Sequence, residues 1–177
     1  IYVVCNFEKE QDLSLPKALH KDDYKVVLHN YADRTALNTK FLPYEIAVYA
    51  NDIDLTFEEL NSKANVFANS LIDRGFKTND KIILKLKRTS KLMIALIGSL
   101  KAGVSFIPVD PNYPQERITH IQEDSGCKMI ISDDPLTGEV GIDNLLNGSN
   151  TTNPKLDLKN DDIAFLIYTS GSTGLPK

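Results

Sequence analysis

The chain has 177 residues, of which 42% are hydrophobic and 25% charged, proportions typical of a folded globular domain. Its 20 lysines and arginines against 24 aspartates and glutamates give a net charge of −4, which argues against a nucleic-acid module that works through a basic surface. The two isolated cysteines, Cys5 and Cys127, are typical of the reducing cytoplasm, and no apolar run approaches the roughly 20 residues that span a bilayer, so we expect a cytoplasmic protein without membrane contacts.

The first 44 residues differ from the rest of the chain because acidic, basic and apolar residues are mixed without a clear period. We interpret residues 1–44 as a leader or interdomain linker, with a weak helical pattern between Tyr24 and Tyr31. The first residue is Ile rather than Met, so we expect the chain to be part of a longer protein.

A hairpin and a helix are predicted where the patterns sharpen, from residue 45. Residues 46–49 form a strand candidate that can pair back with Leu55-Thr56. Thr56 and Glu59 have the spacing of a capping box, in which each side chain accepts a hydrogen bond from the other residue's amide at the start of a helix. Gly75 suits the left-handed residue after that helix. The predicted buried stripe of the helix consists of Phe57, Leu60, Ala64, Phe67, Ala68 and Leu71.

Two further helices are expected between apolar runs. The first can be capped by Ser90 and stopped by Gly103, with Leu92, Ala95, Leu96 and Leu100 facing inward. The second can begin at Pro114, whose missing amide hydrogen is not needed there, and can close at Ser125-Gly126. Residues 133–160 then read as a long polar connection, with a short apolar turn at Ile142, Leu145 and Leu146.

The fold class follows from the alternation of these helices with apolar runs, because strands that alternate with helices form parallel units joined by right-handed crossovers. We therefore predict an α/β fold with a layered parallel, or mostly parallel, sheet and flanking helices. The last run, at 163–168, is almost wholly apolar, which predicts a strand covered on both faces. The predicted strands lie near residues 82–86, 104–107, 128–132 and 163–168.

The most informative segment, residues 168–177, reads Tyr-Thr-Ser-Gly-Ser-Thr-Gly-Leu-Pro-Lys. Glycines permit backbone conformations in which successive amides point at one anion, the hydroxyls add donors, and Lys177 adds a positive charge. These features predict a loop that wraps a polyphosphate. It is not a Walker A loop, because Leu175 and Pro176 separate Gly174 from Lys177. A flexible Ser/Gly linker is the alternative interpretation, although the direct connection to an apolar strand argues against it.

This segment resembles the phosphate-loop motif of the adenylate-forming, AMP-binding enzymes. Two earlier segments narrow the resemblance to the adenylation domains of nonribosomal peptide synthetases. Residues 55–61, Leu-Thr-Phe-Glu-Glu-Leu-Asn, are similar to their first core motif, and residues 100–118, which contain Asp-Pro-Asn-Tyr-Pro-Gln-Glu-Arg, are similar to their second. The three motifs occur in the expected order. The resemblance covers residues 45–177, which it identifies as the N-terminal part of such a domain.

The resemblance implies a reaction with its partners. Adenylation domains join an amino-acid carboxylate to the α-phosphate of ATP, release pyrophosphate, and pass the acyl group to the phosphopantetheine thiol of a peptidyl carrier protein beside neighbouring synthetase domains. Lys177 is then implied as a catalytic residue, and Gly171 and Gly174 would allow the phosphates to approach closely. The implied phosphate-binding residues are Thr169, Ser170, Gly171, Ser172, Thr173, Gly174 and Lys177.

The remaining parts of such a domain are expected beyond Lys177. They include the amino-acid pocket, the acidic residue that handles Mg²⁺, the aspartate that holds the ribose, and a small subdomain with a second catalytic lysine. We therefore expect no metal ligands within the chain, and we expect residues 1–177 alone to be inactive. Two alternative functions stay open, an acyl- or aryl-acid CoA ligase of the same superfamily and a noncatalytic docking module. The tail at 110–117 favours the amino-acid-activating branch.

Overall fold

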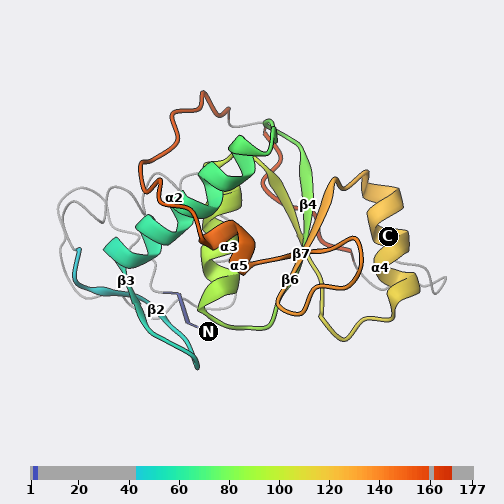
Figure 1. Cartoon of the computed structure of the whole chain (residues 1–177), viewed down its shortest axis with the longest axis horizontal. Coiled ribbons are helices and arrows are strands. Elements are labelled where there is room, and N and C mark those ends of the chain that lie inside the picture. The colour runs from blue at the N-terminus through green and yellow to red at the C-terminus, as the bar shows by residue number, and fades with distance from the viewer. Residues whose placement is uncertain (1, 4–42, 160–161, 169–177) are drawn as a thin grey trace.

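A computed structural model describes residues 2–3, 43–159 and 162–168 of the chain (Figure 1). The helical pattern between Tyr24 and Tyr31 and the predicted phosphate loop at 169–177 lie outside the described residues. Within the described ranges, no helix is both long enough and apolar enough to cross a membrane.

A small antiparallel sheet forms at one end of the described structure. Its strands β1 (Tyr2–Val3), β2 (Ile46–Tyr49) and β3 (Leu55–Thr56) lie in that order, and β2 and β3 form the predicted hairpin. Strand β1 was not predicted, because its two residues fall in the part interpreted as a leader.

The capping box is confirmed at the start of α2 (Phe57–Asp73). The Thr56 hydroxyl accepts from the Glu59 amide at 3.2 Å, and the Glu59 carboxylate accepts from the Thr56 amide at 2.9 Å. All six residues of the predicted stripe are buried, and Gly75 has the expected left-handed backbone, with φ of 83°. The local sequence therefore specified this helix from end to end.

The main sheet is parallel, as predicted. It contains β4 (Lys81–Lys85), β5 (Ser105–Pro108), β6 (Met129–Ser132) and β7 (Val140–Gly141), in the order β5-β4-β6-β7. Strand β7 lies in the segment predicted as a polar connection. With only two residues, it is too short to show an apolar pattern of its own.

Helices cover both faces of the parallel sheet (Figure 1). Helices α2 and α3 (Ser90–Lys101) pack in one core cluster with Ile82 and Leu84 of β4. Helix α4 (Gln115–Ser125) packs in a second cluster with Ile83, which lies between Ile82 and Leu84 in β4 and faces the opposite side of the sheet. A strand buried on both faces needs apolar residues at successive positions, which explains the continuous run in the sequence. The short helix α5 (Asp143–Leu146) contacts α2, and the predicted apolar turn buries Ile142 and Leu145 there.

The predicted caps of the next two helices differ from the structure. Ser90 is the first helical residue of α3, not its cap, and its amide and hydroxyl both donate to the Asp52 carboxylate, at 2.9 and 2.7 Å. Asp52 lies on the turn between β2 and β3, so this cap comes from a distant part of the chain. Burial alone would raise the pKa of Asp52, but the hydrogen bonds from Ser90 hold it below its usual value. Pro114 is the N-cap of α4, one position before the helix.

The prediction of a strand covered on both faces at residues 163–168 is wrong for the described structure. This segment runs beside β5, with one parallel bridge between Phe106 and Phe165. Its side chains alternate in burial: Ile163, Phe165 and Ile167 are 48%, 37% and 62% exposed, whereas Leu166 and Tyr168 pack against the second core cluster. The segment forms an edge of the sheet, and none of the described elements covers its outer face.

Gly98 of α3 permits close packing against α2. A Cβ atom at this position would lie 2.6 Å from Phe67 Cδ1 and 2.9 Å from the Ala64 carbonyl oxygen. We expect Gly98→Ala to lower the free energy of unfolding by about 1–3 kcal/mol, the usual effect of overpacking a core, measured by urea denaturation. Gly141→Ala is the matched control, because its new Cβ would meet Pro135 Cγ at an ordinary 3.4 Å. Equal stability of the two variants would contradict this prediction.

Candidate functional site

The carboxyl ends of the parallel strands gather at one edge of the main sheet. Lys85 ends β4, Pro108 ends β5 and Ser132 ends β6. The segment 163–168 runs parallel to β5, so Tyr168 ends at the same edge. Ligands of open α/β folds bind at this edge, where the loops that follow the strands meet.

The predicted phosphate loop follows Tyr168 directly in the sequence. All of the predicted phosphate-binding residues lie outside the described part of the chain, so their roles stay predictions. They are Thr169, Ser170, Gly171, Ser172, Thr173, Gly174 and Lys177. The structure describes the segment that leads into them, and this segment is held at its start, its middle and its end.

Asn79 holds the start of this segment. Its side-chain oxygen accepts from the Ile163 amide at 2.9 Å, and its side-chain nitrogen donates to Asp162 at 3.0 Å. The Ser105 hydroxyl donates to the Ile163 carbonyl at 2.6 Å. Asn79 has a left-handed backbone, with φ of 67°, a conformation that asparagine tolerates better than most residues. No pattern in the sequence identifies this role, because the residues that Asn79 holds are more than 80 positions away.

Phe106 of β5 holds the middle of the segment. Its amide donates to the Ala164 carbonyl at 3.3 Å, and its carbonyl accepts from the Leu166 amide at 3.0 Å. Its ring stacks on that of Phe165 at a centroid distance of 5.7 Å.

Tyr168 holds the end of the segment, immediately before the predicted loop. Its hydroxyl donates to Asp124 Oδ2 at 2.5 Å, in the last turn of α4. Burial and this hydrogen bond, which favours the protonated phenol, raise the pKa of Tyr168 to about 12. The sequence analysis included Tyr168 in the motif without giving it a role, and it did not identify Asp124.

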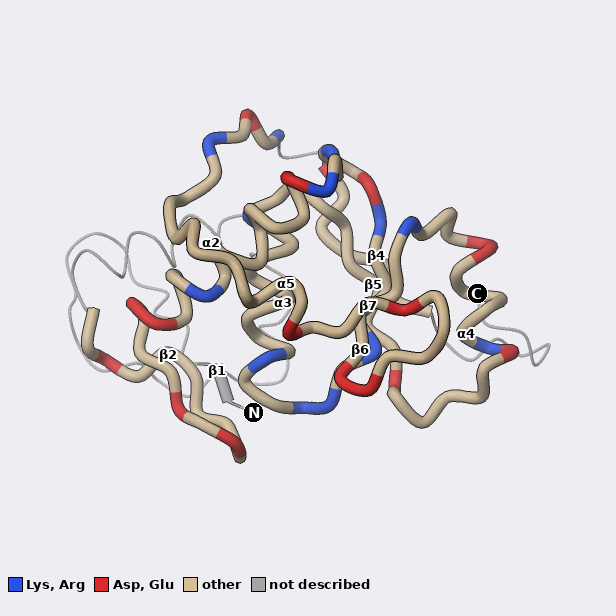
Figure 2. Tube along the Cα trace, viewed as in Figure 1, with Lys and Arg blue, Asp and Glu red and all other residues tan. Residues whose placement is uncertain are grey.

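A buried ion pair closes the same edge of the sheet. Lys85 pairs with Glu139, and their side chains are only 9% and 3% exposed. The second carboxylate oxygen of Glu139 accepts from the Ser132 hydroxyl at 2.9 Å and from the Leu136 amide at 3.0 Å. Burial alone would raise the pKa of Glu139, but the hydrogen bonds from Lys85, Leu136 and Ser132 hold it below its usual value. Basic and acidic residues both occur around this part of the sheet (Figure 2). Lys87 and Asp134 form an exposed ion pair at 2.9 Å. Because Glu139 follows β6 and Lys85 ends β4, their ion pair holds the connection after β6 against β4.

Helix α2 holds the second half of the long connection through asparagines spaced four residues apart. The Asn65 side chain donates to the Thr151 carbonyl at 2.7 Å. The Asn69 side chain donates to the carbonyls of Asn150 and Thr152 at 3.1 and 2.9 Å. We call Asn65 and Asn69 the asparagine clamp. It keeps the chain on α2 before it returns to the edge of β5.

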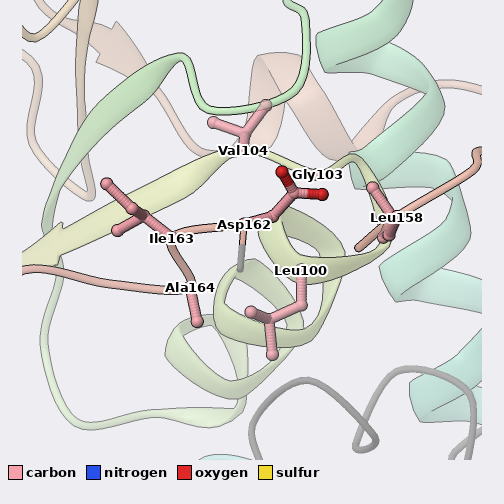
Figure 3. A pocket seen from close by; sticks show the side chains of 7 residues that line it. All are labelled: Leu100, Gly103, Val104, Leu158, Asp162, Ile163 and Ala164. Carbon is pink, nitrogen blue, oxygen red and sulfur yellow. The ribbon is translucent and has the colours of Figure 1, made fainter. Parts of the chain in front are cut away.

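A small cavity lies between α3 and the start of the segment at 162–164 (Figure 3). Leu100, Val104 and Ala164 contribute apolar side chains to its wall. Its volume of about 20 Å³ holds roughly one water molecule, whereas sites for small ligands are more than ten times larger. This cavity is therefore not a nucleotide or amino-acid site. Among the residues that the structure describes, no group of three or more His, Cys, Asp or Glu side chains is placed to hold a metal ion.

The chain is similar in sequence to AMP-binding enzymes and to peptide synthetases. The family model of the AMP-binding enzymes matches residues 28–177. A plipastatin synthase protein of Bacillus subtilis is 34% identical over 182 residues, covering 98% of this chain and 5% of that protein. Surfactin synthase subunit 1 of the same organism is 37% identical over 178 residues, covering 91% of this chain and 5% of that protein. The chain thus spans about one twentieth of the length of these relatives.

Solved structures with the same fold include the N-terminal subdomain of NpsA from Klebsiella oxytoca, in complex with 3-hydroxyanthranilyl-AMSN. It is 26% identical with a TM-score of 0.75, and the match covers 83% of this chain and 39% of that one. An artificially fused adenylation–PCP di-domain from the same organism, NpsA-ThdA, is 26% identical with a TM-score of 0.73, covering 82% of this chain and 31% of that one.

Proposed function

Since this chain belongs to the family of AMP-binding enzymes, we propose that it forms the N-terminal part of an amino-acid-activating adenylation domain in a nonribosomal peptide synthetase. The complete domain joins an amino-acid carboxylate to the α-phosphate of ATP and releases pyrophosphate. It then transfers the aminoacyl group to the phosphopantetheine thiol of a peptidyl carrier protein. The observation that carries this proposal is the similarity of nearly the whole chain to two peptide synthetases.

In this proposal the residues after Tyr168 grip the β- and γ-phosphates of ATP. In phosphoryl and adenylyl transfer the protein mainly positions the reactants and stabilises negative charge, because that charge is concentrated on phosphate oxygens in the transition state. Hydroxyl and amide donors at 169–174 and the Lys177 ammonium supply that charge stabilisation. The firm attachment of the segment 162–168 to Asn79, Phe106 and Asp124 supports this role, because donors act best when their positions are set beforehand.

The partners follow from the same proposal. The Mg²⁺ that accompanies ATP takes its ligands from the remaining part of the protein. A peptidyl carrier protein and neighbouring synthetase domains receive the product, in line with the fused adenylation–PCP relative. We place the enzyme in the cytoplasm, where ATP and amino acids are available.

A second candidate is an adenylation domain for an aryl acid. The observation in its favour is that the NpsA subdomain was solved with 3-hydroxyanthranilyl and 3-hydroxybenzoyl compounds, whose acyl groups are aromatic acids. The cavity beside α3 is too small for either kind of acid, so substrate-dependent exchange decides between the two candidates.

The test is substrate-dependent pyrophosphate exchange by the full-length protein. We expect exchange of labelled pyrophosphate into ATP when one proteinogenic or modified amino acid is added, and only background exchange without it. Exchange with an aryl acid instead would select the second candidate. If the full-length, folded protein shows no exchange above background with any amino acid or aryl acid, both candidates are overturned and a noncatalytic docking module is favoured.

A further inference from the structure

We propose that Tyr168 and Asp124 form a positioning pair that sets where the phosphate loop begins. The inference rests on the proposed function, because it assigns a task to the loop. Tyr168 is the residue directly before Thr169, and its hydroxyl donates to Asp124 Oδ2 at 2.5 Å.

The pair attaches the last described residue of the segment at two points. The Tyr168 side chain packs against the second core cluster, which contains Ile83 and Ile118, and its hydroxyl donates to Asp124 of α4. Neighbouring Cα atoms are about 3.8 Å apart, so the position of Tyr168 limits where the predicted loop can start. Asn79 holds the segment at Ile163, and Phe106 holds it at Ala164 and Leu166, two residues before Tyr168. The Tyr168 side chain is held by its packing and by Asp124.

The helix that carries Asp124 gains nothing from having a carboxylate there. Asp124 lies in the last turn of α4, which contains no basic residue. The negative end of a helix dipole disfavours an acidic side chain in this turn. Asp124 is also exposed to solvent, where a single hydrogen bond contributes little to the stability of the whole fold. The bond to Tyr168 gives this residue a local task, which is to hold the tyrosine.

The effect of the pair is therefore expected in ATP use rather than in folding. Phosphate donors must sit within a fraction of an ångström of their positions, and a displacement of about 1 Å can lower a rate by about 10²-fold. A loop that starts from a less confined residue must be ordered by ATP itself, which weakens the apparent affinity for ATP.

The test uses the full-length enzyme and pyrophosphate exchange with varied MgATP. We expect Tyr168→Phe, which keeps the ring, and Asp124→Ala to raise the KM for MgATP by about three- to ten-fold each, the effect of one lost hydrogen bond. The KM for the acid substrate stays unchanged. Asp124→Asn retains an acceptor and stays within about two-fold of wild type. The double variant is no worse than either single variant, because both remove one shared bond.

The matched control is Glu123→Ala, which removes the neighbouring exposed carboxylate of α4 and should leave both KM values unchanged. The inference is overturned by an active wild-type enzyme whose KM for MgATP is the same in Tyr168→Phe. It is also overturned if the effects of Tyr168→Phe and Asp124→Ala simply add, or if Asp124→Asn is as impaired as Asp124→Ala. The proposed function would survive each of these results, since its own failure would appear as a wild-type protein without exchange activity.

Discussion

Replacing Lys177 by alanine in the full-length protein is expected to lower the maximal rate of pyrophosphate exchange by about 10²–10³-fold. In the proposed function this lysine meets the phosphates of ATP, where negative charge shifts as the α-phosphate is attacked and pyrophosphate leaves. Losing one preorganised charge contact of this kind has an effect of that size in other enzymes. The measurement is exchange at saturating MgATP and saturating acid substrate, so that the change is read as rate rather than affinity.

Two comparisons make the Lys177 result specific. Lys177→Arg keeps the charge but changes its shape, so we expect a rate between those of wild type and Lys177→Ala. Lys155→Ala removes an exposed lysine from the long connection and should have no effect on the rate. A maximal rate that is unchanged in Lys177→Ala would remove this residue from the proposed catalytic machinery.

Replacing Lys85 by methionine is expected to lower the free energy of unfolding by about 3–5 kcal/mol. Methionine fills a similar volume, but it leaves the Glu139 carboxylate buried without its cation. Removing one partner of a buried ion pair is costly for this reason, whereas an exposed pair contributes less than about 1 kcal/mol. The measurement is chemical denaturation of Lys85→Met, with Lys87→Met as the control. Lys87 lies two residues after Lys85, and its replacement breaks the exposed pair with Asp134.

The pH dependence tests the cause of the Lys85 effect. In the wild type the pKa of Glu139 is lowered, so its stabilising contribution is present above the ordinary pKa of a glutamate and is lost as the pH falls through the lowered value. In Lys85→Met burial without the cation raises the pKa of the Glu139 carboxyl, so the deficit relative to wild type shrinks as the pH falls from neutral toward the ordinary pKa of a glutamate. Adding Glu139→Gln at neutral pH should recover much of the loss, since the amide is uncharged and its oxygen can still accept a hydrogen bond. Equal effects of Lys85→Met and Lys87→Met would contradict the prediction.

The features that could be predicted from the sequence are those determined by neighbours along the chain. The capping box of Thr56 and Glu59 depends on a spacing of three residues, and the left-handed ends of α2 and α4 depend on single glycines. The parallel sheet could be predicted because apolar runs and amphipathic helices alternate, and parallel pairing is the geometry that such alternation permits.

The features that could not be predicted depend on contacts between distant residues. Ser90 has the right chemistry for a cap, yet Asp52 fills that role from 38 positions away. The pairing of Asn79 with Ile163 and of Tyr168 with Asp124 likewise spans 84 and 44 positions. An apolar run such as residues 163–168 shows that a strand can be buried but not which elements will cover it.

The candidate site also contains both kinds of feature, those that depend on local sequence and those that depend on contacts between distant residues. A resemblance in local sequence predicts the residues of the phosphate loop, because glycines, hydroxyls and a lysine in one short segment have the chemistry to bind phosphates, and their roles stay predictions. The residues that hold the segment 162–168 come from β5, α4 and the turn before β4, and no local pattern distinguishes them from ordinary strand, helix or turn residues.

The asparagine clamp on α2 has a consequence for how this protein can vary. Asn65 and Asn69 donate to main-chain carbonyls of residues 150–152, and every amino acid supplies a carbonyl. These hydrogen bonds therefore do not depend on which side chains the three residues carry. We expect homologous chains to diverge freely in the identity of these residues while keeping the path of the backbone, provided that both asparagines are retained. The rest of the connection can then change in length and composition without disturbing where the strand segment meets β5.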